Sequence, residues 1–333
     1  MLVSLDTLLH HALINKYAIP AFNINFLEQA MAVIDAASET QSPVIIQFSK
    51  GGLDYAPTWF FKSVLNYAKE SALPIVIHRD HCHSMEEIEQ ALFLGFNSIM
   101  VDGTLTPEGK PRTFKENIAF TQAAMAIKPH DVCIEAELGC LGSLETQKAS
   151  KEDGSGAIGK LKRNQMLTDP IQAKEFVSAT NISALAIAIG TSHGAYKFKT
   201  PPSDETLDID RVKAIAKEIP NTPLVLHGSS SVPKSLCDII NTHGGEIPET
   251  YGVPLLAIQK AIQQGVTKVN IDTDLRLAAT AAIRHTLSTS NTFDPRAYLK
   301  PAYAMMKSVC IERYQAFGSE NQAPGLHHET TRA

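Results

Sequence analysis

The chain has 333 residues, of which 44% are hydrophobic and 20% are charged, which is the composition of an ordinary globular protein. Its formal net charge of -5 and its pI near 6.2 argue against a dedicated nucleic-acid binder, whose surface is usually basic. No segment approaches the unbroken apolar length of a membrane span, and the N-terminal stretch lacks the basic region of a signal peptide.

Eight apolar runs predict strands that are buried on both faces, because they lack a strict alternation of polar and apolar residues. Helical patterns lie between several of them. Eight strands that alternate with helices favour a (β/α)8 TIM barrel. An open doubly wound sheet is the alternative, but its early Gly-x-Gly-x-x-Gly turn is absent. The predicted strands are Ile19–Asn25, Val44–Phe48, Ile75–Arg79, Ser98–Asp102, Val132–Leu138, Ala184–Ile189, Leu224–His227 and Lys268–Asp272. The predicted helices are Leu27–Thr40, Met85–Leu94, Pro170 to about Ala179, Asp210–Ile219 and Leu255–Gln264.

Two segments lie outside this alternation. Gly139–Lys160 is long, polar and rich in glycine, which is typical of a mobile active-site loop, although a disordered surface loop is the alternative. The tail from Phe293 contains one more helical pattern, roughly Ala297–Ala316, which we interpret as an oligomer contact or a cover for the barrel. We therefore expect a single barrel domain over residues 1–333 with a C-terminal helical extension.

The cysteines favour a reducing compartment. The chain has five cysteines, an odd number, and no Cys-x-x-Cys occurs, so we do not expect a disulfide framework. We expect a cytoplasmic location. Cys133 and Cys237 lie in apolar settings and are typical of small core residues. Cys82 lies between His81 and His83, and we interpret it as a neighbour of the site described next.

Three histidines, His81, His193 and His227, each follow a predicted strand. In a barrel of this kind the carboxyl ends of the strands carry the active site. Imidazole is a common zinc ligand, and three protein ligands leave one position open for catalysis. One such histidine is more often structural, but three together with Asp102 and Glu137 indicate a metal enzyme. Further polar residues at the strand ends are Asn23, Asn25, Ser49, Asp80, Glu135, Asn270, Asp272 and Thr273.

Two turns predict a phosphate site. Gly228–Ser231 follows the seventh strand and Asn270–Asp274 follows the eighth, the usual place for phosphate in this fold. Small residues with free backbone N–H groups form anion nests. Gly194 lets the backbone approach a ligand, and Lys197 supplies a cation nearby.

The sixth predicted strand contains no lysine. Aldol chemistry on a sugar phosphate uses either a Schiff-base lysine or a metal ion. Lys50 and Lys268 are the only lysines next to strands, and the sequence shows no obvious partner that would perturb either of them. A metal ion as electron sink therefore fits this chain better.

Seven stretches carry a resemblance to a known family: Pro20–Asn25, Gln47–Gly52, Asp80-His81, Ile134–Glu145, Ala186–Phe198, Leu226–Pro233 and Lys268–Arg276. Through them the chain resembles the class II fructose-1,6-bisphosphate aldolases over nearly its whole length, and most closely the branch of Calvin-cycle and bacterial glycolytic enzymes. The resemblance implies reversible cleavage of fructose 1,6-bisphosphate to dihydroxyacetone phosphate and D-glyceraldehyde 3-phosphate through a zinc-stabilised enediolate.

The resemblance also implies roles for the polar residues. A catalytic Zn²⁺ would bind to three histidines, and a second divalent metal would have Asp102 and Glu137 as ligands. Asp80 would be the acid/base at the C4 hydroxyl, and Glu145 on the loop would exchange the proton at the carbon that becomes nucleophilic. The zinc ligands would be His81, His193 and His227.

For the substrate, the resemblance implies that Ser49 contacts the glyceraldehyde 3-phosphate half and that Asn23 belongs to the binding set. Arg296 would reach the far phosphate from a neighbouring subunit of a homodimer or homotetramer, and a monovalent cation would assist phosphate binding. The residues for the dihydroxyacetone phosphate half would be Gly194, Gly228, Ser229, Ser230, Asn270, Ile271, Asp272 and Thr273.

The chain departs from this branch beside the first histidine. Cys82-His83 follows Asp80-His81 where Gly and a small or hydroxyl residue are common, and Arg79 replaces a smaller or polar residue. We do not assign His83 as a fourth zinc ligand, because a closed four-ligand site is structural.

Three alternatives stay open. Tagatose-1,6-bisphosphate aldolase shares the site and differs in C4 stereochemistry. A metal-dependent hydrolase is more distant, since three histidines and a carboxylate also activate water. A binding protein with an inactive site is the third.

Overall fold

The computed structural model describes residues 1–139, 166–191, 198, 200–202 and 207–330. Its eight strands are all parallel and pair in sequence order, and β8 pairs with β1 to close a barrel. The predicted (β/α)8 barrel is therefore confirmed. The strands are β1 (Ile19–Asn23), β2 (Val44–Phe48), β3 (Ile75–Cys82), β4 (Ser98–Val101), β5 (Cys133–Leu138), β6 (Ala184–Ile187), β7 (Leu224–Leu226) and β8 (Val266–Ile271).

The helices include every predicted one, with bounds that shift by at most two residues, and several that the sequence patterns did not indicate. They are α1 (Leu5–Asn15), α2 (Leu27–Thr40), α3 (Lys50–Tyr55), α4 (Thr58–Glu70), α5 (Met85–Leu94), α6 (Phe114–Ile127), α8 (Pro170–Thr180), α9 (Ile209–Glu218), α10 (Lys234–Thr242), α11 (Leu255–Gln263), α12 (Thr273–Thr289), α13 (Pro295–Ala316) and α14 (Ala323–Thr330). Among the residues described, no helix combines the length and the apolar character that a bilayer crossing needs.

Side chains inside the barrel change from apolar to polar along the strands. Alternate strand residues point inwards. In β5, the inward residues are Cys133, then Glu135, then Glu137, and all three are buried. At the amino end of the barrel, α1 and the first inward residues form one apolar cluster that closes the bottom. That cluster includes Leu5, Leu8, Leu9, Ile19, Ala21, Ile45, Val76, Met100, Cys133, Ala184, Ala186 and Val225.

The outward faces of the strands pack against the surrounding helices. Each fully buried Leu, Ile, Val or Phe stabilises the fold by about 1.5–3 kcal/mol, so this large outer layer offsets the cost of polar groups in the barrel interior. Phe48 of β2 illustrates the packing, because its ring makes edge-to-face contacts with Phe60, Phe61 and Phe96. The four cysteines that the structure describes, Cys82, Cys133, Cys237 and Cys310, are buried and free.

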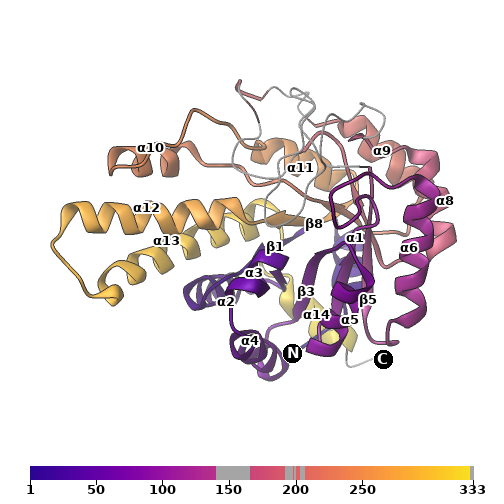
Figure 1. The fold of residues 1–333 in the computed structure, drawn as a ribbon, viewed down its shortest axis with the longest axis horizontal. Helices are drawn as coiled ribbons and strands as arrows, with labels where there is room; N and C mark the ends of the chain where they lie inside the picture. Colours follow the sequence, from indigo (N-terminus) through magenta and orange to yellow (C-terminus); the bar gives the residue numbers. More distant parts are fainter. Residues whose placement is uncertain (140–165, 192–197, 199, 203–206, 331–333) are drawn as a thin grey trace.

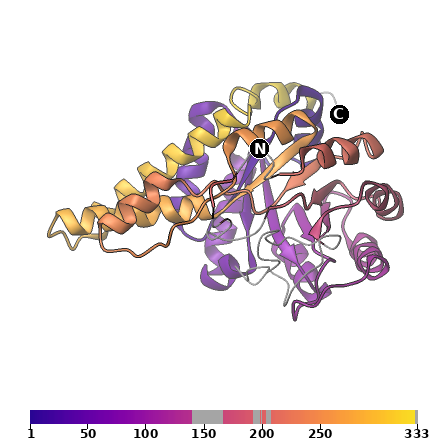
Figure 2. The same cartoon turned by 90° about the horizontal axis from the view of Figure 1, so that it is seen from above.

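The C-terminal extension forms a long helical pair. Figure 1 shows α12 and α13 lying side by side and projecting from the barrel, with α10 beside α12, and Figure 2 shows the same projection from above. The helix α13 also covers α2, to which it is tied by Tyr303 Oη donating to Asp35 Oδ2 at 2.7 Å and by an ion pair of Lys307 with Glu39 at 2.8 Å. The predicted extension is thus confirmed, and it covers one side of the barrel.

Candidate active site

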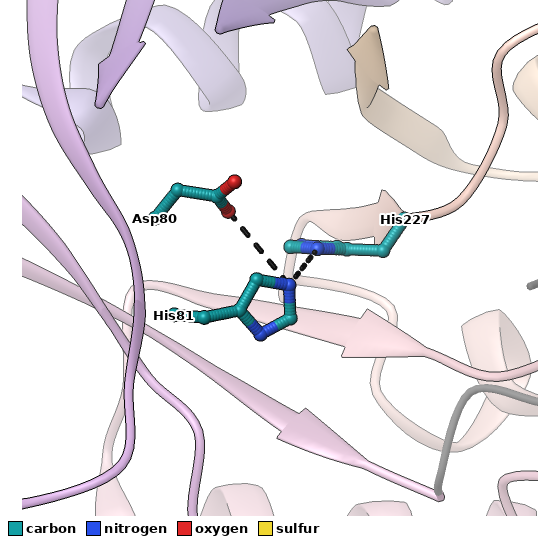
Figure 3. A group of neighbouring side chains, drawn as sticks. All are labelled: Asp80, His81 and His227. Atoms are coloured by element: carbon teal, nitrogen blue, oxygen red, sulfur yellow. Dashed lines mark hydrogen bonds and ion pairs between the residues drawn. The ribbon is translucent and has the colours of Figure 1, made fainter. Parts of the chain in front are cut away.

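The carboxyl ends of four strands bring five of the predicted polar residues together. Asp80 and His81 lie in β3, Asp102 follows β4, Glu137 lies in β5 and His227 follows β7. All five side chains are buried. Figure 3 shows Asp80, His81 and His227 pointing toward one another across the barrel mouth.

An irregularity in β3 makes this arrangement possible. Consecutive strand residues normally point to opposite faces, but the pairing of β3 with β4 shifts between Arg79 and Cys82. Within this bulge His81 has a φ of 47°, in the left-handed region that few non-glycine residues adopt. The bulge turns the side chains of Asp80 and His81 to the same site. Local backbone strain of this kind is often found where function requires it.

His81 and His227, the two predicted zinc ligands that the structure describes, are each held by a carboxylate. Nδ1 of His81 lies 2.8 Å from Oδ2 of Asp102, and Nε2 of His227 lies 2.7 Å from Oε1 of Glu135. An ionised carboxylate only accepts hydrogen bonds, so these ring nitrogens carry the protons in the neutral rings. Nε2 of His81 and Nδ1 of His227 then carry lone pairs, and these two atoms are 3.1 Å apart, while Nδ2 of Asn270 lies 3.0 Å from Nδ1 of His227.

The electrostatics at this point favour a cation. Burial disfavours the charged form of His81, but Asp80 and Asp102 outweigh it and raise the pKa of the ring to about 9. Burial is the largest influence on His227 and lowers its pKa. For Asp80, burial opposes ionisation, yet His81 and His227 hold the pKa of this carboxyl well below its usual range. Asp80 is therefore a carboxylate.

Glu137 adds a further donor atom. Its Oε2 is buried and makes no hydrogen bond within the part of the chain that the structure describes. Burial, together with the charge of Asp102, raises the pKa of this carboxyl well above its ordinary value. Buried polar groups are rarely left unsatisfied, and a metal ion is a common partner for such a carboxylate. Asp80, His81 and His227 form a group of metal-ligand types whose ligand atoms lie within 4.8 Å of one another, which fits a divalent metal ion, and the unsatisfied oxygen of Glu137 is a further candidate donor.

Asp80 is oriented by two amides. Nδ2 of Asn23 donates to its Oδ2 at 2.9 Å, and Nδ2 of Asn270 is 3.3 Å from its Oδ1. Gln47 in turn donates to Oδ1 of Asn23 at 2.7 Å, which fixes the direction of that amide. Oδ1 of Asp80 lies 3.8 Å from Nε2 of His81, so the carboxylate borders the position where a metal fits.

His83 lies behind Asp102. Its Nδ1 is 3.3 Å from the backbone oxygen of Asp102 and 3.5 Å from Oδ2. Oδ1 of Asp102 accepts from the N–H and the hydroxyl of Thr104. His81, His83 and Asp102 form a second group of metal-ligand types, with ligand atoms within 4.8 Å of one another. Since Asp102 already uses Oδ2 for His81, the contacts of His83 are those of a side chain that supports Asp102.

The two predicted phosphate turns are joined. The N–H of Asp272 donates to Oγ of Ser230 at 3.4 Å, and the hydroxyl of Ser229 donates to the backbone oxygen of His227 at 3.1 Å. Helix α12 starts at Thr273, so its N-terminus lies at the same turn, where an anion is stabilised. Ser49 lies across the mouth as the N-cap of α3, accepting from Gly52 N–H at 3.0 Å.

The other predicted residues are not among the contacts described above. His193, Gly194, Lys197, Glu145 and the loop segment 140–160 lie outside the described residues. Arg296 is exposed at the start of α13 and pairs with Asp294 at 2.8 Å, so within its own chain it stays on the projecting helical pair.

Lys268 has two partners that were not obvious in the sequence. Its Nζ lies 2.9 Å from Oε2 of Glu135 and donates to Oδ1 of Asn270 at 2.8 Å, and both charged side chains are fully buried. His78, which the sequence patterns do not single out, is 3.8 Å from the same Glu135 oxygen, and burial lowers its pKa to about 3. The signal was available in the alternation of β8, which turns Lys268 and Asn270 inward together. Lys50 by contrast is exposed and pairs with Asp54.

The sequence matches the model of the family described as fructose-bisphosphate aldolase class-II over residues 3–322. Fructose-bisphosphate aldolases of Stutzerimonas stutzeri and Pseudomonas aeruginosa are each 50% identical over 327 residues, which cover 97% of this chain and 92% of theirs. Among solved structures, the YdjI aldolase from Escherichia coli K12 has a TM-score of 0.73 at 30% identity and covers 97% of this chain and 100% of its own. The chain belongs to the class II fructose-bisphosphate aldolase family.

Proposed function

We propose that this chain catalyses the reversible aldol cleavage of fructose 1,6-bisphosphate to dihydroxyacetone phosphate and D-glyceraldehyde 3-phosphate, and that it does so in the cytoplasm. The observation that carries the proposal is the carboxylate of Asp80 next to two converging histidine nitrogens at the barrel mouth. A metal position and a base side by side suit a reaction that breaks a carbon–carbon bond beside a ketone.

The metal we propose is zinc, held by Nε2 of His81, Nδ1 of His227 and a nitrogen of His193. When bound, zinc supplies a Lewis acid that polarises the substrate ketone and stabilises the negative charge that develops on its oxygen. Asp102 and Glu135 hold two of the rings in the tautomers that this binding requires. We further propose Asp102 and Glu137 as ligands of a second metal position.

Asp80 carries out the proton transfer at C4, and the residues around it orient its carboxylate. In cleavage, Asp80 accepts the proton of the C4 hydroxyl, C4 becomes a carbonyl, and the electron pair of the C3–C4 bond stays with C3. Asn23 and Asn270 keep the carboxylate facing the substrate. We propose that Glu145 returns a proton to C3. In the condensation direction the same groups act in reverse order.

The two phosphates occupy opposite sides of the mouth in this proposal. The turn at Gly228–Ser230 and the residues Asn270–Thr273 bind the dihydroxyacetone phosphate half, together with Gly194 and a monovalent cation. Ser49 contacts the other half. Arg296 reaches the far phosphate from a second subunit of a homodimer or homotetramer, which fits its exposed place on the projecting helical pair.

Metal removal and borohydride trapping test this proposal. EDTA followed by desalting should abolish cleavage, and added Zn²⁺ should restore it. Borohydride with substrate should trap no lysine adduct, because Lys268 is buried in an ion pair. Full activity after metal removal contradicts the proposal. The ratio of kcat/KM for fructose 1,6-bisphosphate to that for tagatose 1,6-bisphosphate should exceed one, and a ratio below one assigns the tagatose sugar instead.

A further inference from the structure

A buried ion pair connects the C-terminal helix α13 with the loop after β7. Arg313 of α13 and Asp274 of α12 have side chains that are 1% and 0% exposed, and Nη2 of Arg313 lies 3.0 Å from Oδ2 of Asp274. The same Nη2 donates to Oγ of Ser231 at 2.6 Å. Removing two charges from water is costly, and the attraction between them only offsets that cost. A fully buried ion pair is therefore unusual for a helix that lies outside the barrel.

Asp274 holds two consecutive peptide groups of that loop. Its Oδ2 accepts from the N–H of Ser231 at 3.1 Å, and its Oδ1 accepts from the N–H of Val232 at 2.8 Å. Val232 has a φ of 45°, which is uncommon for a β-branched residue. The carboxylate therefore stabilises a turn that the sequence alone disfavours.

The residues just before this turn form the proposed anion site. Within the described part of the chain, the peptide N–H groups of Gly228, Ser229 and Ser230 make no hydrogen bond to the backbone, so they remain available to an anion. The N-terminus of α12 adjoins them through the contact of Asp272 with Ser230.

The charge of Asp274 is a difficulty for this site. Asp274 is the second residue of α12, so a negative charge is buried beside the place where phosphate binds, and like charges repel strongly where water is excluded. Arg313 offsets that charge from the far side, because its guanidinium contacts the carboxylate directly.

We propose that Arg313 and Asp274 are positioning residues that set the phosphate affinity of the loop after β7. Asp274 directs the loop, and Arg313 neutralises Asp274 so that the loop can accept an anion. This inference rests on the proposed function and deepens it, because it gives the C-terminal extension a part in substrate binding. Neither residue contacts the reacting atoms.

The test is R313M compared with the matched control R284M. Arg284 also lies on the projecting helical pair, and its Nη1 donates to the backbone oxygen of His243 at 3.4 Å. In the metal-loaded enzyme, R313M should raise KM for fructose 1,6-bisphosphate by about tenfold, which corresponds to about 1.4 kcal/mol of binding free energy. The kcat and the metal content should change little. Competitive inhibition by inorganic phosphate should weaken by a similar factor, and R284M should match the wild type.

An unchanged KM in R313M, a loss confined to kcat, or equal effects of R313M and R284M would each overturn the inference. If R313M does not fold, R313K is the variant to test. Lysine keeps the positive charge but lacks the planar guanidinium of arginine. We then expect a smaller rise in KM, and unchanged KM and phosphate inhibition would overturn the inference.

Phosphate binding separates this inference from the proposed function. Inorganic phosphate should raise the Tm of the metal-loaded wild type, because a ligand of the folded state stabilises it. A wild type that binds phosphate but does not cleave the bisphosphate contradicts the proposed function alone. An R313M variant with the full phosphate-induced rise in Tm contradicts this inference alone.

Discussion

Nε2 of His81 lies 3.1 Å from Nδ1 of His227, and each ring is fixed on its other side by a buried carboxylate. Two lone pairs this close repel each other unless a cation or a proton lies between them. The pair therefore favours metal binding through its own electrostatics, and the carboxylates behind the rings should matter nearly as much as the rings.

The first prediction concerns Asp102. D102N replaces an acceptor with an amide whose N–H₂ cannot accept from Nδ1–H of His81, so the ring loses its fixed tautomer. We expect the zinc affinity, measured by competition with a chelator, to fall by about 10- to 100-fold. D238N is the control, because Asp238 is an exposed carboxylate that pairs only with Lys234 among the described contacts. Equal zinc affinity in both variants would contradict the assigned role.

The second prediction concerns Asp80. D80N keeps the size of the side chain but removes the base, so kcat should fall by about 10²- to 10⁴-fold. Metal content should stay close to the wild type, because the proposed zinc ligands are histidines. The amide nitrogen of D80N cannot accept a hydrogen bond, so one of the two contacts with Asn23 and Asn270 is lost. A D80N enzyme that retains most of its kcat excludes Asp80 as the acid/base.

The third prediction concerns the ion pair beneath the site. K268M leaves Glu135 buried without its cation, and breaking a fully buried pair typically costs about 3–5 kcal/mol. Urea unfolding of the metal-free protein should show this loss in the free energy of unfolding. K50M, which breaks the exposed pair with Asp54, should leave that free energy nearly unchanged. Similar values for the two variants would mean that Glu135 finds another partner.

The fourth prediction concerns His83. If this side chain supports Asp102 instead of binding the catalytic metal, H83S should keep the zinc-to-protein ratio of the wild type. H227A should lower that ratio in the same measurement, since His227 is a proposed ligand. Loss of zinc from H83S would make His83 a ligand and would point to the group that it forms with His81 and Asp102.

The strands were predictable because burial on both faces requires continuous apolar runs, which the sequence displays directly. The end of β3 was not predictable, because Asp80, His81 and Cys82 continue the strand through a bulge that no local sequence pattern indicates. The start of α12 is a related case, because the pattern Asn270–Asp274 predicts a binding turn, and Thr273 within it is also the first residue of a helix.

The candidate site was predictable where a residue's type and its place at a strand end were sufficient. The proposed zinc ligands His81 and His227 and the proposed base Asp80 are of this kind. The hydrogen-bond and ion-pair partners of these residues were harder to predict from the sequence. Glu135, for example, contacts Lys268 only because the closed barrel brings distant strands together. The contact of Arg313 with Asp274 depends on how α13 folds back, which strand order does not determine.

The bulge in β3 has a consequence for how the site tolerates change. Asp80 and His81 are neighbours in the chain and face the same site, so a single peptide unit separates the proposed base from the first proposed ligand. Covalent geometry, and not the packing of distant elements, then sets their spacing. Substitutions in the surrounding helices can shift the whole strand, but they move both groups together and leave their relative position intact.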